Sequence, residues 1–425
     1  MVAFEYLAVT PIVTPIVNDL GNSSAYTLVV GSVLLAQLIS NALSGIIIDA
    51  FGAIRPTVIG SCTFGIGLLI CGCAPNMTVF IIGRLIQGFG GGAVVVGCYA
   101  LVGTIVPVEH QPHFFTSFAT AWVLPSLIAP GLAGYITTQF SWRYVFFLVP
   151  ICLILAMPSL HTTAKSYSFL DSQTLKKKQS IRTLTRTTFL ALVSGSTLLI
   201  WQLPISSSHS VAIIWPRIVA AAIAIFAVIP LLALRGIVSS HRPRYDITAR
   251  LLLNGAYVAI ETSLPLFFQI CHKWSVQQSG LLMSIGSITW AIGSWLSTVP
   301  KEPKARKHLI PSGGVITFVS VLCVSASATA NSSPLFILVL WSVVGLGVGI
   351  AYPTLAVDAL AHAPFNAKGI VSGALQIADG FGSTLCVGLL GLSLAITADN
   401  FQASYTIMAV ISLAALIIGS ISNSR

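Results

Sequence analysis

The chain has 425 residues, of which 55% are hydrophobic and only 8% are charged, and its net charge is +10. Soluble domains carry about a quarter of charged residues, so this composition excludes a protein whose whole surface faces water. Apolar runs of about 20 residues recur along the chain, and each is long enough to cross roughly 30 Å of hydrocarbon as an α-helix. The sequence therefore predicts an all-α polytopic membrane protein in a lipid bilayer, without a separate soluble domain.

Fourteen apolar runs are candidate membrane spans, with ends defined to within a few residues. They cover residues 1–18, 27–48, 56–74, 78–106, 113–139, 143–160, 187–204, 211–235, 248–271, 276–299, 308–330, 334–357, 368–397 and 401–422. The connections are short except for 161–186 and 236–247, which have the composition of solvated loops. Twelve spans are the alternative, because the runs 187–204 and 211–235 are the weakest. The first span begins almost at Met1, an abrupt start that would suit a missing cytoplasmic leader or a misplaced start.

The positions of lysine and arginine predict the orientation, because short loops rich in these residues stay on the cytoplasmic side. With the N-terminus inside, the cytoplasmic set is Arg55, Lys165, Lys176, Lys177, Lys178, Arg182, Arg186, Arg235, Arg242, Arg244, Arg250, Lys301, Lys304, Arg306, Lys307, Lys368 and Arg425. Only Arg143 and Lys273 then lie outside, which supports an even number of spans. We expect a multi-pass protein of the cell membrane with both termini in the cytoplasm. This alternation explains the positive charge, so nucleic acid is not expected as a partner.

The chain carries an internal repeat, because two separate matches occur at nearly the same offset. The matches are Val2–Glu5 with Val258–Glu261, and Gly88, Gly90 and Gly92 with Gly345, Gly347 and Gly349. The simplest account is an N-terminal six-helix bundle at 1–160 and a C-terminal six-helix bundle at 248–425. Residues 161–247 would then form a cytoplasmic loop and an inserted, central helix pair.

Ionisable residues within spans are functional candidates, because an unpaired charge there is costly. The candidates are Glu5, Arg84, Glu261 and Asp379. Glu5 and Glu261 occupy equivalent positions of the repeat, so we expect both near the interface between the halves. A carboxylate in a partly dry cavity holds a proton more tightly than in water, and it also attracts a cationic substrate. The alternative is that each carboxylate only hydrogen-bonds a neighbouring helix.

Two segments resemble signatures of the major facilitator superfamily. Gly45-Ile-Ile-Ile-Asp49-Ala-Phe-Gly52-Ala-Ile-Arg55-Pro56 is similar to the cytoplasmic loop signature, and Gly83-Arg84-Leu-Ile-Gln87-Gly88-Phe-Gly90 is similar to the second signature. The wider pattern resembles the drug:proton antiporters, especially the fourteen-helix branch and its actinobacterial members. The segments that carry this likeness are Phe4-Glu5 with Ala8-Val9, Ser141–Phe146, and Gln376–Asp379. The resemblance implies two six-helix bundles and proton-coupled efflux of apolar or cationic small molecules by alternating access. It is weakest over 161–247.

The first signature predicts a conformational latch. Gly45 and Gly52 permit a close helix approach and a tight turn, while Asp49 can favourably face the N-terminus of a neighbouring helix. The resemblance assigns the latch of the transport cycle to Gly45, Asp49, Gly52 and Arg55. The alternative is an ordinary capped turn with a basic residue that only anchors the orientation.

The second signature places Arg84, Gln87, Gly88 and Gly91 on one face of a helix. The glycines of this segment, including Gly90, let the helix press against its neighbours. Arg84 then needs a carboxylate or carbonyl partner, and Glu5 is the first expectation. The resemblance adds a role in proton transfer. The alternative is a packing arginine satisfied by backbone oxygens.

The run 113–139 departs from the antiporter signature, which has a Gly-Pro step followed by paired glycines. Here the segment reads Ala129-Pro130-Gly131-Leu132-Ala133-Gly134, so only Pro130 and Gly134 match. Pro125 and Pro130 predict a bent helix. The departure leaves open a second hypothesis, proton-coupled import of a small metabolite.

Three aromatic residues, Trp122, Tyr257 and Trp290, are candidates for lining an apolar binding cavity, with core packing as the alternative. The cysteines lie in or beside apolar runs and are interpreted as small buried hydrophobes, so no metal site is predicted. No cluster typical of an enzyme stands out. The sequence thus predicts a monomeric secondary transporter of a small molecule, with the proton gradient as energy source and no cofactor. A non-transporting membrane sensor is the less favoured alternative.

Overall fold

The computed structural model describes residues 1–9, 12–20, 26–166, 181–201, 211–232, 242–274, 276–300, 308–329, 331–397 and 400–424. Within these ranges the regular structure is helical, with no strand. Ten of the described helices are long and apolar enough to cross a membrane. Helices satisfy their own backbone hydrogen bonds, which a segment in hydrocarbon requires. The prediction of an all-α multi-pass membrane protein is confirmed.

The N-terminal group of helices runs from residue 2 to residue 166. Its members are α1 (Val2–Val9), α2 (Val13–Asp19), α3 (Tyr26–Phe51), α4 (Ile54–Gly72), α5 (Met77–Ile105), α6 (Gln111–Gln139) and α7 (Trp142–Ser166). Helix α5 packs along both α3 and α4, α7 packs on α4, and α6 packs along α1. Their common core includes the buried side chains of Phe64, Phe80 and Phe146.

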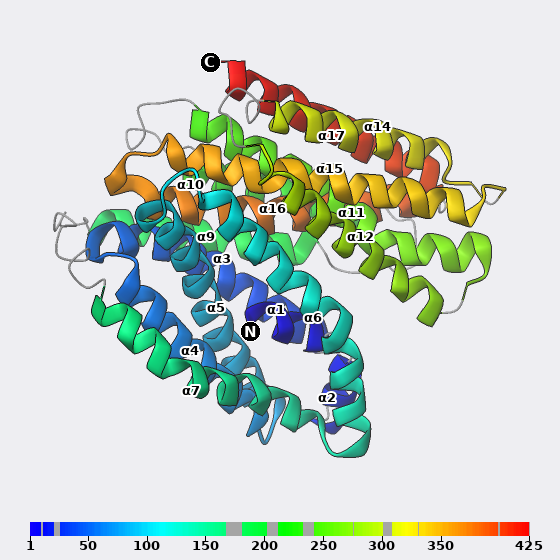
Figure 1. The fold of residues 1–425 in the computed structure, drawn as a ribbon. Helices are drawn as coiled ribbons and strands as arrows, with labels where there is room; N and C mark the ends of the chain where they lie inside the picture. The colour runs from blue at the N-terminus through cyan, green and yellow to red at the C-terminus, as the bar shows by residue number, and fades with distance from the viewer. Residues whose placement is uncertain are drawn as a thin grey trace.

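The C-terminal group begins at residue 242. Its members are α11 (Arg242–His272), α12 (Val276–Leu296), α14 (Leu309–Ala326), α15 (Pro334–Ala361), the 3-10 helix η3 (Phe365–Ala367), α16 (Lys368–Ile396) and α17 (Phe401–Ser424). Helix α15 packs on α11, α12 and α14, and α17 packs on α11 and α14. Figure 1 shows the two groups side by side, with the helices of the C-terminal group in the upper part of the view.

Helices α9 (Ile181–Trp201) and α10 (Val211–Leu232) pack against each other, at the place where the two groups meet. Helix α9 contacts α3 of the N-terminal group and α16 of the C-terminal group. The indole Nε1 of Trp201 donates a hydrogen bond to the backbone oxygen of Leu385, at 3.1 Å. The inserted pair therefore covers the junction between the groups.

Every one of the fourteen predicted runs overlaps a helix, with α1 and α2 together forming the first run. Three predicted limits are wrong, because helices extend into the segments expected to be loops. Helix α7 continues to Ser166, α9 begins at Ile181, and α11 begins at Arg242 rather than near residue 248. The reason is that the helix turns beyond each apolar run carry polar residues, so their composition resembles that of a solvated loop. The number of spans, fourteen or twelve, and the division at residues 160 and 247 stay predictions.

The two glycine triplets of the repeat make the same pattern of helix contacts. In the N-terminal group, Gly88 and Gly92 press against α3 and Gly90 presses against α4. In the C-terminal group, Gly345 and Gly349 press against α12 and Gly347 presses against α14. Each triplet thus alternates between two neighbouring helices, because glycine alone leaves room for such close backbone approach. This correspondence supports the internal repeat.

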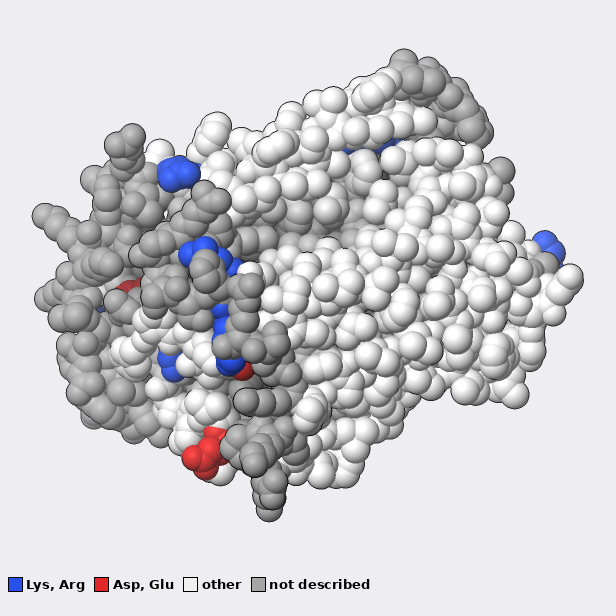
Figure 2. Space-filling view, turned by 90° about the horizontal axis from the view of Figure 1, so that it is seen from above, with Lys and Arg blue, Asp and Glu red and all other residues white. Residues whose placement is uncertain are grey.

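The surface matches a protein embedded in lipid. Large apolar side chains are widely exposed, among them Leu155 and Phe226 at 76% each and Leu335 at 70%. Figure 2 shows a broad uncharged surface, with the visible charged side chains gathered mainly towards one end of the molecule. An exposed apolar surface of this extent requires a partner other than water, and the bilayer provides it.

Candidate functional site

The first buried ion pair joins α1 and α5. Arg84 Nη1 donates to Glu5 Oε1 and, at 2.8 Å, to Gln87 Oε1. Arg84 Nε donates to the backbone oxygen of Val29 at 3.3 Å. Glu5 is 5% exposed and Arg84 is 3% exposed, so each charge depends on the other for compensation. Arg84 thus pairs with Glu5, the carboxylate that the sequence predicts as its partner. It also contacts a backbone oxygen, as in the alternative interpretation.

Close backbone packing fixes the position of Arg84. Helix α5 starts at a capped end, where Asn76 Oδ1 accepts a hydrogen bond from the Val79 amide at 3.0 Å. A Cβ atom on Gly88 would lie 2.5 Å from the backbone oxygen of Val33 on α3. Gln87 is fully buried, and its Nε2 has no hydrogen-bond partner. The close packing of α5 against its neighbours therefore fixes the position of the Arg84 side chain along the helix bundle.

The second buried ion pair joins α11 and α16. Arg250 Nε donates to Asp379 Oδ1 at 2.9 Å, and Arg250 Nη2 donates to Asp379 Oδ2 at 2.7 Å. The hydroxyl of Tyr352 on α15 donates to the same Oδ2 at 2.7 Å. Arg250 is fully buried, and a bidentate pair of this kind is among the strongest polar contacts in proteins.

Arg250 belongs to the basic residues expected on the cytoplasmic side, but its side chain is not solvated there. It is 0% exposed inside the helix bundle, and the side of the membrane on which it lies stays a prediction. The sequence contains a signal for this ion pair. Asp379 in an apolar run needs a compensating cation, and the predicted run 248–271 contains Arg250.

The second ion pair also connects the two groups of helices. Arg250 Nη2 lies 3.0 Å from the hydroxyl oxygen of Tyr99, which belongs to α5. The guanidinium carbon lies 3.7 Å from the ring centre of Tyr352 and 5.3 Å from that of Tyr99, a cation–π arrangement. Asp379 and Arg250 therefore lie at a contact between the two groups of helices. Each group contributes one aromatic residue to this contact, Tyr99 from α5 and Tyr352 from α15.

Glu261 lies in an aromatic environment, and no arginine among the described residues pairs with it. Its Oε1 accepts a hydrogen bond from the hydroxyl of Tyr257 at 3.1 Å. The Tyr257 ring stacks on Trp341 at 4.9 Å and meets the edge of Trp290 at 4.8 Å, and Trp290 contacts Tyr352 at 5.0 Å. Tyr257 is 1% exposed, so it packs in the core, whereas Trp290 is half-buried.

Tyr6 on α1 brings the carboxylates of the two groups into one neighbourhood. It lies within electrostatic reach of Glu5, Arg84 and Glu261. Its ring contacts the edge of Trp122 on α6 at 6.2 Å. Tyr6 and Trp122 are 41% and 47% exposed, so these two rings have free surface for a ligand to contact. Tyr6 is thus within electrostatic reach of a carboxylate from each group of helices.

Asp49 binds the N-terminus of α16. Its Oδ1 accepts a hydrogen bond from the Gly369 amide at 2.6 Å, and its Oδ2 accepts one from the Ile370 amide at 2.9 Å. The first amides of a helix lack partners within it and carry partial positive charge, so a carboxylate is well suited to this position. Asp49 faces the N-terminus of a neighbouring helix, as the signature indicated.

The surrounding residues bring α3 and α16 into backbone contact. A Cβ atom on Gly45 would lie 2.7 Å from the Gly369 oxygen, and one on Gly373 would lie 2.6 Å from the Asn41 oxygen. Gly52 ends α3 with a φ of 85°, which favours glycine. Arg55 follows in the first turn of α4 and is exposed.

The same end carries further contacts between the groups. Lys368 Nζ donates to the Gly103 oxygen on α5. The Thr116 hydroxyl on α6 donates to the Ser294 oxygen on α12 at 2.9 Å. A buried apolar cluster there includes Val102 of the N-terminal group and Leu360 of the C-terminal group. The molecule is therefore closed at the end that carries Asp49.

Helix α6 does not use Gly134 for a close helix contact in this conformation. A Cβ atom on Gly134 would meet nothing within 4 Å. The reason is that α6 uses another face to contact α1, α7 and α12, and leaves side chains such as Leu124 and Tyr135 exposed at 60% and 61%. Pro130 lies within the same helix, and its side chain is outside the described set.

A second cluster ties the N-terminal helices together at the opposite end. Asp19 Oδ2 accepts hydrogen bonds from Arg143 Nη1 at 2.5 Å and from Trp142 Nε1 at 3.1 Å. These hydrogen bonds lower the pKa of Asp19 below its ordinary value. Arg143 Nη2 also donates to the Ala74 oxygen at 3.1 Å. The sequence pattern singles out the segment Ser141–Phe146, but it does not predict that Asp19 is the partner of this segment.

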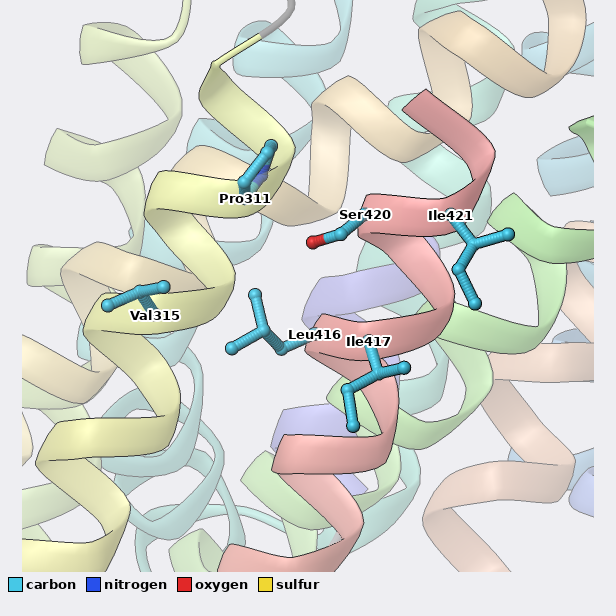
Figure 3. Close-up of a pocket in the computed structure, with 6 residues that line it drawn as sticks. All are labelled: Pro311, Val315, Leu416, Ile417, Ser420 and Ile421. Atoms are coloured by element: carbon cyan, nitrogen blue, oxygen red, sulfur yellow. The ribbon is translucent and has the colours of Figure 1, made fainter. Parts of the chain in front are cut away.

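Figure 3 shows an open apolar groove between α14 and α17. Its lining residues are Pro311, Val315, Leu416, Ile417, Ser420 and Ile421. None of them is charged or belongs to the clusters above, so this groove is not part of the candidate site. Among the described residues, no group of three or more His, Cys, Asp or Glu side chains could hold a metal ion.

Ten helices that are long and apolar enough to cross a membrane, with two ion pairs buried among the described helices, define a polytopic membrane protein. The chain belongs to the Major Facilitator Superfamily, whose family model matches residues 1–387. The superfamily predicted from the two signatures is thereby confirmed. Its members are transporters and not enzymes, and this chain is a membrane transporter.

Two curated relatives extend over most of the chain. Multidrug resistance protein 3 of Bacillus subtilis (strain 168) is 26% identical over 402 residues, which is 92% of this chain and 76% of that protein. A probable multidrug-efflux transporter of Mycobacterium tuberculosis (strain ATCC 25618 / H37Rv) is 23% identical over 392 residues, 87% of this chain and 82% of that protein.

Solved structures share the fold at low identity. The human organic anion transporter MFSD10 has a TM-score of 0.69 at 12% identity, covering 98% of this chain and 96% of that one. A bacterial homologue of the iron transporter ferroportin in an outward-facing state has a TM-score of 0.68 at 12% identity, covering 99% and 96%. These likenesses show the fold alone.

Proposed function

We propose that this transporter exports apolar or cationic small molecules across the cell membrane in exchange for protons, by alternating access. The observation that carries the proposal is the buried Glu5–Arg84 pair, with Tyr6 within electrostatic reach of both this pair and Glu261. The names of the relatives from Bacillus subtilis and Mycobacterium tuberculosis support a multidrug type of substrate. The proton gradient is the energy source, and no cofactor takes part.

A proton on Glu5 removes the charge that compensates Arg84. The guanidinium then keeps only Gln87 and the Val29 oxygen as partners, so the contact between α1 and α5 weakens. A cationic substrate beside Glu5 or Glu261 favours the deprotonated carboxylate instead. Proton and substrate therefore compete for the same negative charge, which is the physical requirement for exchange.

The Asp379–Arg250 pair transmits this competition to the interface between the groups. When Asp379 is ionised it orients Arg250, whose Nη2 reaches Tyr99 of the N-terminal group. A proton on Asp379 frees Arg250 to turn, and the link to Tyr99 loosens. Glu5 and Asp379 are thus the proposed proton sites, and Arg84 and Arg250 are their charge partners.

Asp49 acts as the latch in this scheme. It closes one end by binding the α16 N-terminus, and moving α16 away would leave the Asp49 carboxylate and two amides without these partners. We place this end, which also carries the C-terminal end of α17, on the cytoplasmic side, because Arg242 and Lys368 of the described helices lie at it. Helix α1 begins inside the bundle, where Val2 lies beside Gly91 of α5. The present conformation is then closed towards the cytoplasm. Fourteen spans and a monomeric unit complete the proposal.

Vesicles reconstituted with purified protein test the proposal. Wild-type protein in inside-out orientation should accumulate a fluorescent organic cation such as ethidium when the lumen is acidic, and collapsing the gradient should stop accumulation. Glu5→Gln should insert and bind the cation but lose the response to the gradient. Asp19→Asn, an exposed carboxylate at the other end, should behave as wild type. Gradient-driven accumulation by Glu5→Gln at the wild-type rate would contradict the assignment.

A proton-coupled importer is the second candidate function, and the changed signature Ala129–Gly134 on α6 favours it. The direction of substrate movement separates the two functions. Under an outwards-acidic gradient, an importer concentrates its substrate with the protons, whereas an exporter moves it against them. Binding without movement under any gradient would instead favour the sensor hypothesis.

A further inference from the structure

Asp246 is a buried acid that belongs to neither ion pair. It lies in the second turn of α11 and is 0% exposed. Among the described residues, neither of its carboxyl oxygens has a hydrogen-bond partner with ordinary distance and angle, and its polar neighbours are Asp358 and Ser422. Glu5 and Asp379, by contrast, each accept hydrogen bonds from an arginine. An ionised carboxylate buried without a partner is strongly disfavoured relative to its neutral form.

The neighbours of Asp246 come from three helices. Asp358 on α15 and the Ser422 hydroxyl on α17 lie beside it, with Arg242 on its own helix. Asp358 Oδ1 lies 3.4 Å from His362 Nδ1, and His362 Nε2 lies 2.9 Å from Arg242 Nη1. Ser422 donates to the backbone oxygen of Arg242 at 3.4 Å. The side chain that faces Asp246 is thus a second carboxyl group, that of Asp358. Arg242 contacts His362.

We propose that Asp246 and Asp358 form a carboxyl pair that binds one proton in this conformation, as a proton site separate from Glu5 and Asp379. Two adjacent carboxyl groups do not both ionise readily, because each charge raises the cost of the other. A bound proton removes one charge and lets one carboxyl donate to the other. Arg242 and His362 beside the pair make it a poor site for a metal cation.

The location gives the pair access to one side of the membrane. Asp358 is 27% exposed, so the proton is exchanged with water through Asp358. Ile247, the next residue to Asp246, belongs to the buried cluster that also contains Tyr99 and Leu360 and that closes the Asp49 end. Loss of the proton places a second negative charge beside this closed interface. The proton therefore stabilises the closed end, whatever the direction of transport.

The test is the pH dependence of unfolding of the purified, full-length protein. A group that keeps its proton when folded and loses it when unfolded makes stability fall as pH rises. Asp246→Asn retains the neutral shape without the titration. Between about pH 5 and pH 8, the folding equilibrium constant of wild type relative to Asp246→Asn should fall by about tenfold per pH unit. Asp19→Asn serves as control, and its difference from wild type should not change over the neutral part of this range.

A ratio of the two equilibrium constants that stays independent of pH would overturn the proposal. Infrared difference spectra give a readout that does not depend on unfolding. At neutral pH, wild type minus Asp246→Asn should show a protonated carboxyl band, and absence of the band would overturn the bound proton. Stabilisation of wild type, but not of Asp246→Asn, by sodium or calcium at constant pH would also overturn it, in favour of a metal cation.

Discussion

The two groups of helices hold equivalent carboxylates in different ways. Glu5 is paired with Arg84, whereas Glu261 has only the hydroxyl of Tyr257. Arg84 stands four residues before Gly88, and Trp341 stands four residues before the matching Gly345, so the repeat replaces the arginine by an indole. One carboxylate is compensated by an arginine, and we propose that the other binds a proton or a cationic ligand. A symmetric arrangement of helices thus carries asymmetric chemistry.

The arginine of the C-terminal group lies elsewhere. Arg250 pairs with Asp379, and the position that matches Asp379 at the glycine offset is Trp122, which carries no charge. Among the described residues, each group therefore has one buried arginine–carboxylate pair, and the second pair contacts the opposite group through Tyr99. In the proposed mechanism both pairs exchange protons, and the second pair also couples the two groups.

The largest effect is expected for Asp379→Asn, because it leaves the fully buried Arg250 without a charge partner. Breaking a buried pair in this way costs about 3–5 kcal/mol. Thermal unfolding in detergent should show a strongly destabilised protein. The double variant Asp379→Asn with Arg250→Gln should recover part of the loss, and a double variant as unstable as the single one would argue against the pairing.

A smaller effect is expected for Glu261→Gln, because Glu261 has a phenol and not an arginine as partner. The amide oxygen can still accept the Tyr257 hydrogen bond, so stability should change by less than about 1.5 kcal/mol. Affinity for an organic cation, measured by fluorescence titration, should fall, while affinity for a neutral analogue of similar size should not. Equal losses for both ligands would contradict the cation-binding role.

A steric prediction separates two glycines. Gly45→Ala should weaken the closed end by about 1–3 kcal/mol, because its Cβ would overlap the Gly369 oxygen. Gly134→Ala is the matched control, since nothing lies within 4 Å of its Cβ position. The accessibility of a cysteine placed near residue 103 to a polar thiol reagent reports the opening. Increased labelling in the Gly134 variant alone would refute the packing assignment.

The smallest effect concerns the exposed Asp19 cluster, where the pKa of the carboxyl lies below its ordinary value because Arg143 and Trp142 donate to it. Its stabilisation is present above the pKa of the unfolded chain and is lost as pH falls through the folded value. Wild type should therefore lose slightly more stability in acid than Asp19→Asn. Parallel acid unfolding curves would show that the cluster adds nothing.

The sequence sufficed for the class of fold and for one of the two ion pairs. Apolar runs locate the helices, and Arg84 needs an acid that only a few residues in spans can supply. Arg250 and Asp246 were missed because the turns that begin α11 are polar and resemble a loop, so basic residues near them looked solvated. The open face at Gly134 depends on how α6 rotates against α1 and α12, which spacing along one helix does not determine.

Proton movement caused by substrate is the most direct test of the central claim. Proteoliposomes with an internal pH indicator and no imposed gradient receive an organic cation on one side. Wild-type protein should move protons opposite to the cation, whereas Glu5→Gln should pass the cation without proton movement. Proton counterflow in Glu5→Gln equal to that of wild type would contradict the account.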